Sequence, residues 1–248
     1  MRRMLPTALE QRSPRKAHAL ELFAGLPRHY DRMGALLSFG QDPRWRRALV
    51  AAIDPQHGQR ILDVATGTGL VAAALARRGA TVVGLDQSEQ MLARARQRLG
   101  DRVELVHGEA ERLPFPDQSF DALTFTYLLR YVDDPAATLA ELARVVKRGG
   151  RLGMVEFGVP RRRVARRLWR VHTGAGLPAL GRLAGPAWIE VGRFLGPSIE
   201  GFWAAHPDGG LVELWQLAGI GDVSLRAMTF GAGIVMTGVR DGGGTQRA

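Results

Sequence analysis

Residues 61–69 (ILDVATGTG) constrain the fold of this chain more than any other stretch, because an apolar run ends there in a carboxylate and a Gly-x-Gly turn. A second apolar run, residues 81–85, ends in another acid, Asp86. The two runs predict a strand, a tight turn and a helix, followed by a second strand parallel to the first. Gly67 and Gly69 allow the backbone to pass close to a ligand where a Cβ would clash.

The predicted turn has the features of a site for an adenosine-containing cofactor. The helix after the turn directs its first N–H groups at such a ligand. Asp86, at the carboxyl end of the second strand, is placed to accept hydrogen bonds from a ribose diol. A plain glycine turn in an α/β fold, with no ligand, is the simpler alternative.

The turn alone allows two cofactors, because residues 67–72 (GTGLVA) also fit the relaxed dinucleotide pattern G-x-G-x-x-G/A. Asp63 favours S-adenosylmethionine (SAM) over NAD, since a carboxylate before the turn suits a ligand's ammonium group and not a pyrophosphate. Residues 108–121 (GEAERLPFPDQSFD) resemble the loop after the third strand of class I SAM-dependent methyltransferases. We therefore expect SAM as the cofactor.

Strand and helix patterns alternate between residues 60 and 157, which predicts an α/β fold with a doubly wound, mainly parallel, seven-stranded Rossmann-like sheet. Two later strand patterns are separated by Phe230 and Gly231, so an antiparallel C-terminal hairpin is expected at a sheet edge. A dehydrogenase would instead repeat the mononucleotide-binding half. The expected strands span 60–64, 81–85, 103–107, 120–126, 151–157, 222–229 and 232–239, and the helices span 70–78, 88–99, 135–147 and 208–218.

Local composition divides the chain into six parts. Pro6 and Pro14 interrupt a polar, basic start that is expected to be disordered. Residues 147–150 (KRGG) predict a helix end, with cations in the last turn and glycine beyond it. We expect a basic tail at 1–16, an N-terminal helical region over the active site at 17–53, a SAM-binding core at 54–159, a helical cap at 160–205, a C-terminal helix and β-hairpin completing the sheet at 206–240, and a flexible tail at 241–248.

Composition limits the chemistry that is available to the chain. There is no cysteine, so disulfides, thiolate metal sites and cysteine nucleophiles are excluded, and no metal site is expected. No apolar run approaches the roughly 18 residues that a bilayer-spanning helix needs, and the basic start lacks the apolar region of a secretory signal. We therefore expect a cytoplasmic enzyme.

The formal charge of +10 comes almost wholly from arginine, since only Lys16 and Lys147 are lysines. Arginines are spread along the whole chain, whereas nucleic-acid binding favours a basic stripe interleaved with aromatic residues, so no nucleic-acid partner is expected. Six arginines cluster within residues 161–170, which fits either a solvated helix face or a basic amphipathic helix on anionic lipid. In the second case Trp169 and Trp188 would favour the membrane interface.

Four further segments carry a resemblance to a known family. They are residues 29–33 (HYDRM), 37–46 (LSFGQDPRWR), 155–160 (VEFGVP) and 195–202 (LGPSIEGF). Together with the turn and the loop after the third strand, they are similar to the ubiquinone/menaquinone-biosynthesis C-methyltransferase family over nearly the whole chain. The resemblance implies the fold described above, SAM as methyl donor, and C-methylation of a prenylated quinol such as demethylmenaquinol in respiratory quinone biosynthesis.

The resemblance also implies site residues. It places Asp63, Gly67, Thr68 and Gly69 around the methionine end of SAM, Asp86 at the ribose, Glu109 and Ala110 beside the adenine, and Thr126 at the methionine tail. Arg130 takes the position of the family's catalytic arginine, which can orient a water and stabilise a phenolate. Tyr30 would line the acceptor pocket, and Tyr131 could donate a hydrogen bond in place of an expected asparagine. His29 and His172 are alternative bases.

Three departures from the family pattern lie near the expected acceptor pocket. Leu70 replaces an aspartate, and Gly34 and Tyr131 each replace an asparagine. They leave open an alternative acceptor, a soluble phenolic or polyketide-type secondary metabolite, as well as an adenosine-binding protein without turnover. The partners expected are therefore an aromatic or quinol acceptor, a peripheral contact with an anionic membrane, and, as an open alternative to a monomer, a homodimer.

Overall fold

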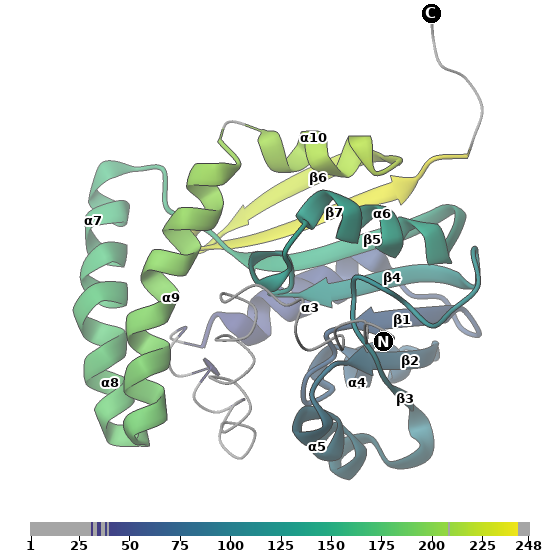
Figure 1. The fold of residues 1–248 in the computed structure, drawn as a ribbon, viewed down its shortest axis with the longest axis horizontal. Helices are drawn as coiled ribbons and strands as arrows, with labels where there is room; N and C mark the ends of the chain where they lie inside the picture. The colour runs from purple at the N-terminus through teal and green to yellow at the C-terminus, as the bar shows by residue number, and fades with distance from the viewer. Residues whose placement is uncertain (1–30, 32–33, 36–37, 39, 208, 243–248) are drawn as a thin grey trace, which may run out of the picture.

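The computed structural model describes residues 31, 34–35, 38, 40–207 and 209–242 (Figure 1). The tail predicted at 1–16, most of residues 17–41 and nearly all of the tail predicted at 241–248 lie outside these residues. The elements are α3 (Asp42–Ile53), β1 (Arg60–Val64), α4 (Leu70–Ala76), β2 (Thr81–Asp86), α5 (Glu89–Leu99), η1 (Gly100–Arg102), β3 (Glu104–His107), β4 (Phe120–Thr126), η2 (Leu129–Tyr131), α6 (Pro135–Val145), β5 (Val146–Phe157), α7 (Arg163–Val171), η3 (His172–Gly176), α8 (Leu177–Ala184), α9 (Pro186–Ala205), α10 (Gly210–Leu217), β6 (Ile220–Met228), η4 (Thr229–Gly231) and β7 (Gly233–Arg240).

One seven-stranded sheet runs through the molecule in the order β3-β2-β1-β4-β5-β7-β6. The first five strands in this order are parallel, and Leu62 of β1 pairs with Val83 of β2 and with Leu123 of β4. β7 is antiparallel to both of its neighbours, β5 and β6. The prediction of a doubly wound, mainly parallel sheet with an antiparallel C-terminal hairpin is thereby confirmed.

The strand order reverses beside β1, because β2 and β3 extend to one side of it and β4 and β5 to the other. In open α/β sheets, ligands bind in the crevice at the carboxyl ends of the strands that flank such a reversal. Ala65 follows β1 and Tyr127 follows β4, and both adopt the left-handed conformation, with φ of 53° and 57°. Non-glycine residues held in this conformation cluster at functional sites, which also directs attention to the ends of these strands.

Helices cover both faces of the sheet. α3, α4 and α5 pack on one face through a core that includes Trp45, Leu75 and Leu99. α6 and α10 pack on the other face through Leu142 and Trp215. The parallel strands are therefore buried on both sides, which is why they appear in the sequence as nearly continuous apolar runs.

α7, η3, α8 and α9 form the cap, which lies beside the sheet at the left of Figure 1. The expectation that Trp169 and Trp188 lie at a membrane interface is wrong, because the two side chains are only 9% and 5% exposed. They pack inward with Leu177 and Val191 in a hydrophobic core of the cap itself. None of the helices in the described part of the chain combines the length and apolar character needed to cross a bilayer.

The boundary between α6 and β5 differs from the sequence prediction. Residues 147–150, predicted as a helix end, lie inside β5, which begins at Val146. Val146 pairs with Phe120, and a bulge then shifts the register of the two strands. Gly150 is required beside the bulge because a Cβ there would lie 2.5 Å from the backbone oxygen of Asp121. Strand pairing over a long sequence distance thus overrides the local helix-ending signal.

Candidate active site

A cavity of about 520 Å³ lies at the carboxyl ends of β1, β2 and β4. Its sheet side is lined by residues that include Gly67, Asp86 and Ala110, and its far side by cap residues that include Leu177 and Trp188. The cavity is therefore continuous from the reversal of the sheet into the apolar interior of the cap. Its volume falls in the range of roughly 300–1,000 Å³ that is typical of small-molecule sites.

Asp86 ends β2 at the cavity wall, where its side chain is largely buried. Its carboxylate accepts hydrogen bonds from the backbone N–H of Gly67 at 2.8 Å and of Ser88 at 2.9 Å. Burial raises the pKa of Asp86, and the N–H groups of Ser88 and Gly67 offset part of this rise. The two bonds join the Gly-x-Gly turn to the start of α5 and hold the carboxylate where a ribose diol is expected.

The two glycines of the turn have different surroundings. Gly67 lines the cavity with a φ of 57°. Gly69 has a φ of 80°, and a Cβ on it would lie 2.6 Å from Cδ1 of Leu99 on α5. Gly69 is thus required where the turn packs against α5, whereas Gly67 borders the ligand space.

Asp63 lies next to the turn but behind the cavity wall, where it is buried. Thr124 Oγ1 donates to its Oδ1 and Thr66 Oγ1 to its Oδ2, each at 2.7 Å. Burial raises the pKa of Asp63 to about 6, although both hydroxyl donors lower it. The carboxylate therefore ties β1 to β4 and to the turn, while the expected contact with a ligand ammonium group stays a prediction.

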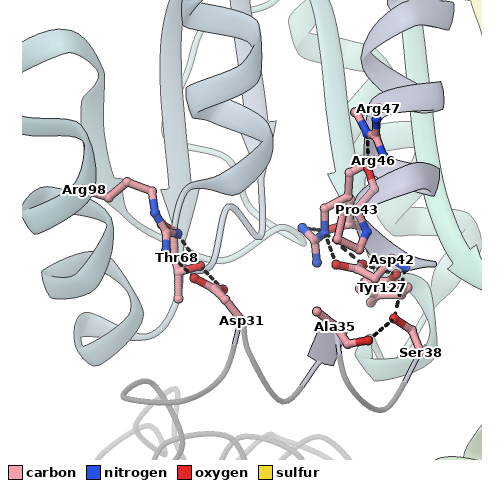
Figure 2. Close-up of polar contacts among 11 residues, drawn as sticks. Asp31, Ala35, Ser38, Asp42, Pro43, Arg46, Arg47, Thr68, Arg98 and Tyr127 are labelled. Atoms are coloured by element: carbon pink, nitrogen blue, oxygen red, sulfur yellow. Dashed lines mark hydrogen bonds and ion pairs between the residues drawn. The ribbon is translucent and has the colours of Figure 1, made fainter. Parts of the chain in front are cut away.

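Thr68 does not line the cavity, and its hydroxyl is engaged by the side chains of Asp31 and Arg98 (Figure 2). It donates to Asp31 Oδ1 at 2.6 Å and accepts from Arg98 Nη1 at 2.8 Å. Arg98 of α5 also forms an ion pair with Asp31. Thr68 thus connects Asp31 to the turn, and its expected cofactor contact stays a prediction.

Ala110 and Glu109, both expected beside the adenine, differ in position. Ala110 is buried and lines the cavity with Leu85 and Met91, which form an apolar wall, whereas Glu109 does not line it. Gln87 Oε1 on the same wall is a buried acceptor without a hydrogen-bond partner among the described residues. A ligand that combines a flat ring with hydroxyl or amino donors, as adenosine does through its adenine and its ribose, would satisfy this acceptor. The residues present therefore fit the expected cofactor.

A second polar cluster lies on the β4 side of the cavity (Figure 2). Thr126, expected at the methionine tail, lines the cavity, and its Oγ1 accepts a hydrogen bond from Arg46 Nη1 of α3 at 3.4 Å. Arg46 Nε donates to both carboxylate oxygens of Asp42 at 2.9 Å, and Tyr127 Oη donates to Asp42 Oδ1. Sequence reasoning did not select Asp42 and Arg46, although their i,i+4 spacing on a helix is a usable ion-pair signal.

Arg130 and Glu156 form a buried ion pair beside the cavity. Arg130 Nε donates to Glu156 Oε1 at 2.8 Å, and both side chains are 1% exposed. Burial alone would lower the pKa of Arg130, but the charge of Glu156 raises it above its ordinary value. Arg130 is therefore a permanent cation and not a proton acceptor. It lines the cavity, and within the described chain its buried Nη2 has no hydrogen-bond partner.

Tyr131 lies on the same wall and contacts the cap. Its ring lies 4.7 Å from Arg130 Cζ and stacks with Phe194 of α9 at 6.2 Å between centroids. Burial raises the pKa of Tyr131, so the side chain is a neutral phenol at physiological pH. Arg130 Nη1 also donates to Ser198 Oγ of α9 at 3.3 Å. Arg130 and Tyr131, two of the three residues predicted for catalysis, thus lie at the junction of sheet and cap.

The other expected catalytic residues have separate outcomes. Tyr30 and His29 lie outside the described residues. His172, an alternative base, lines the cavity where the π-helix η3 begins. Sequence reasoning did not pair Glu156 with Arg130, because the two residues lie 26 positions apart and no local pattern connects them.

Known proteins share both sequence and fold with this chain. The family model described as the ubiE/COQ5 methyltransferase family matches residues 11–240. A demethylmenaquinone methyltransferase of Clavibacter sepedonicus is 42% identical over 217 residues, covering 86% of this chain and 86% of that protein. A ubiquinone/menaquinone biosynthesis C-methyltransferase, UbiE, of Geobacter sulfurreducens is 35% identical over 226 residues, covering 88% and 86%.

Solved structures share the fold at lower sequence identity. A SAM-dependent methyltransferase of Aquifex aeolicus is similar with a TM-score of 0.57 and 18% identity, covering 79% of this chain and 89% of that chain. Phosphoethanolamine N-methyltransferase 2 of Haemonchus contortus, solved in complex with SAM, is similar with a TM-score of 0.58 and 17% identity, covering 80% and 52%. These similarities show the fold of class I SAM-dependent methyltransferases.

Proposed function

Since this chain belongs to the ubiE/COQ5 methyltransferase family, we propose that it methylates a ring carbon of demethylmenaquinol or of a closely similar prenylated quinol. Membership of the family confirms the resemblance seen in the sequence and identifies the protein as a SAM-dependent methyltransferase. The acceptor is carried over from the names of the relatives, and the cavity supports it.

The observation that carries the proposal is the buried Nη2 of Arg130, which has no hydrogen-bond partner among the described residues. A buried donor without an acceptor is costly, and an anionic oxygen is the strongest acceptor for a guanidinium. The phenolate oxygen of a deprotonated quinol would supply it, and the fixed cation would stabilise the electron-rich ring. The adjacent ring carbon then takes the methyl group, and the ring C–H proton leaves as the aromatic ring is restored. SAM supplies the electrophilic methyl group on its sulfonium sulfur.

Three further residues take roles in this proposal. Tyr131 donates a hydrogen bond at the acceptor ring, and Tyr30, which lies outside the described residues, keeps its predicted role on the acceptor side. A water oriented by Arg130 accepts the quinol proton, with His172 as the alternative acceptor. Positioning of ring and methyl donor contributes much of the rate, and the proton acceptor adds roughly 10²- to 10⁴-fold.

The apolar interior of the cap suits the prenyl part of the acceptor. Leu177, Trp188, Val191, Leu195 and Ile199 line the far side of the cavity. An isoprenoid chain has no hydrogen-bonding groups, so it gains from leaving water for such a wall at about 25 cal/mol per Å² of buried apolar surface. A ring held beside Arg130 would thus direct its tail into the cap.

Incubation of the protein with SAM and a short-chain demethylmenaquinol tests the function. Tandem mass spectrometry of the product is expected to locate the new methyl group on a ring carbon. The oxidised quinone is the control and should not react, because it cannot form a phenolate. An O-methyl product, or turnover of soluble phenolic compounds in place of the quinol, would contradict the proposal and favour the soluble-metabolite alternative.

The proposal includes a contact with the membrane through the expected arginine-rich helix, α7, but with exposed aliphatic side chains in place of the buried indoles. Val164, Leu168 and Val171 of α7 are 75%, 66% and 62% exposed, and their spacing places them on one helix face. Phe230 at the hairpin tip is 81% exposed. Leu168 and Phe230 also line the cavity, so this apolar surface borders a point where the cavity reaches the outside.

A homodimer stays a prediction, which the mass in solution would test.

Vesicle binding tests the membrane contact. Wild-type protein should co-sediment with phosphatidylglycerol vesicles at low salt, and binding should fall about 30-fold when Arg163 and Arg167 are changed to Gln, since each arginine contributes about 1 kcal/mol. Changing Arg77 and Arg78, two exposed arginines at the end of α4 away from the cap, to Gln is the matched control. Turnover of a long-chain quinol should fall with binding, whereas a short-chain analogue should react as before. No vesicle binding at low salt would contradict the contact.

A further inference from the structure

Arg46 places a cation on the cavity wall at the β4 side of the sheet reversal. It belongs to α3, lines the cavity and has a side chain that is 15% exposed. Its Nη1 lies 3.4 Å from Thr126 Oγ1 at the end of β4. Burial raises the pKa of Asp63, which lies near the end of β1. The positive charge of Arg46 is close enough to offset part of this rise. The guanidinium therefore lies over the ends of the two strands at which the order reverses.

Asp86 and Thr126 end the two strands, β2 and β4, that flank β1. Strands in a sheet lie about 4.8 Å apart, so these ends are about 10 Å apart. SAM carries a ribose at one end of a run of single bonds and an amino-acid carboxylate at the other. With its ribose at Asp86, this run extends across β1 towards Arg46. We infer that Arg46 binds the carboxylate of the methionine end, an assignment that depends on the methyl donor and not on the acceptor proposed above.

Asp42 and Tyr127 position the Arg46 guanidinium (Figure 2). Both carboxylate oxygens of Asp42 accept from Arg46 Nε at 2.9 Å, which fixes the plane of the guanidinium. Tyr127 Oη donates to Asp42 Oδ1, and burial together with the Asp42 charge holds the pKa of Tyr127 well above its ordinary value, so the phenol keeps its proton. Asp42 is therefore held by both Arg46 and Tyr127, which keeps the guanidinium at the cavity wall. A guanidinium can bind a carboxylate through paired hydrogen bonds.

The surroundings of Arg46 differ from those of an ordinary surface ion pair on a helix. Arg44 and Arg47, its neighbours on α3, are exposed, and Arg47 Nε donates to the backbone oxygen of Pro43. The Arg46 and Asp42 side chains are only 15% and 10% exposed, and both line the cavity. An ion pair that only stabilised the helix would be expected on the exposed face of α3 and not at the cavity wall.

Calorimetry with three ligands tests the inference. Arg46→Met should weaken SAM binding roughly 10- to 100-fold, the range for losing hydrogen bonds to a charged group. Decarboxylated SAM and 5′-methylthioadenosine lack the carboxylate, so their affinities should be the same for the variant as for wild type. Arg47→Met removes an exposed arginine from the same helix and should leave all three affinities unchanged.

The three ligands separate binding from folding. Equal weakening of all of them in Arg46→Met would show that Arg46 only supports the fold, and undiminished SAM affinity would show that it does not touch the carboxylate; either result overturns the inference. If thermal denaturation shows that Arg46→Met does not fold, Arg46→Lys replaces it as the test variant. Lysine keeps the positive charge but cannot form the paired hydrogen bonds of a guanidinium with a carboxylate. Selective weakening of SAM in that variant supports the assignment, and a change shared by all three ligands overturns it.

Discussion

Replacing Arg130 by methionine is expected to lower the free energy of unfolding by about 3–5 kcal/mol, because the change leaves a charged carboxylate buried without its partner. Glu156, the partner, is 1% exposed and receives the Arg130 Nε–H at 2.8 Å. Urea denaturation at neutral pH measures the loss. Since burial already raises the pKa of Glu156 from 4.5, the folded variant gains a proton more readily than the unfolded chain does. The difference in the free energy of unfolding between wild type and Arg130→Met should therefore become smaller as the pH falls from 7 towards 4.5.

The double variant Arg130→Met with Glu156→Gln is the control for the ion pair. It removes both charges, so much of the stability lost in Arg130→Met should return. Turnover should not return with it, because the cation that we propose to stabilise the acceptor oxygen is still missing, and SAM affinity should stay near wild type. Full turnover in the double variant would contradict the catalytic role of Arg130, and a double variant as unstable as the single one would contradict the importance of the ion pair.

Changing Asp86 to alanine is expected to weaken SAM binding by about 1.5–3 kcal/mol, the range for losing hydrogen bonds to a charged group. The carboxylate is expected to hold the ribose, and it also receives the N–H groups of Gly67 and Ser88 that shape the turn and the start of α5. Calorimetry measures the change. 5′-Methylthioadenosine should lose affinity as well, because it retains the ribose, which distinguishes this variant from Arg46→Met.

Asp101→Ala, which removes an exposed acid after α5, provides the comparison for the Asp86 variant. It changes the net charge by the same amount and should leave the affinity for SAM unchanged. Undiminished SAM affinity in Asp86→Ala, or an equal loss in Asp101→Ala, would remove the basis for placing the ribose at Asp86.

The strands and the turn could be predicted because their signals are local. Residues 61–69 combine a continuous apolar run with two glycines, and a strand that is covered on both faces needs such a run. The hairpin around Phe230 could be predicted for the same reason, since a short turn between two strand patterns is a local feature. The end of α6 could not, because the pairing of Val146 with Phe120 depends on the sheet and not on the neighbouring residues.

The contacts of the candidate site could not be predicted from the sequence, because they connect residues that are far apart along the chain. Nothing near Arg130 in the sequence identifies Glu156 as its partner, and the hydrogen bond from Tyr127 to Asp42 spans 85 positions. The direction of an indole on an amphipathic helix also depends on what packs against it, so Trp169 could be assigned to a helix but not to its buried side. Spacing along the chain therefore located the strand ends, while tertiary packing decided which side chains face the cavity.

The position of β7 has a consequence for how the chain is made. β7 is the last strand of the described chain to be translated, yet it lies inside the sheet between β5 and β6. Ribosomes add about 5–20 residues per second, so β5 is an unpaired edge of the sheet until β7 has been synthesised. Glu156 of β5, for example, pairs with Ile234 of β7. The edge of β5 is thus covered last, and a premature stop before Gly233 would remove an interior strand and leave an edge prone to self-association.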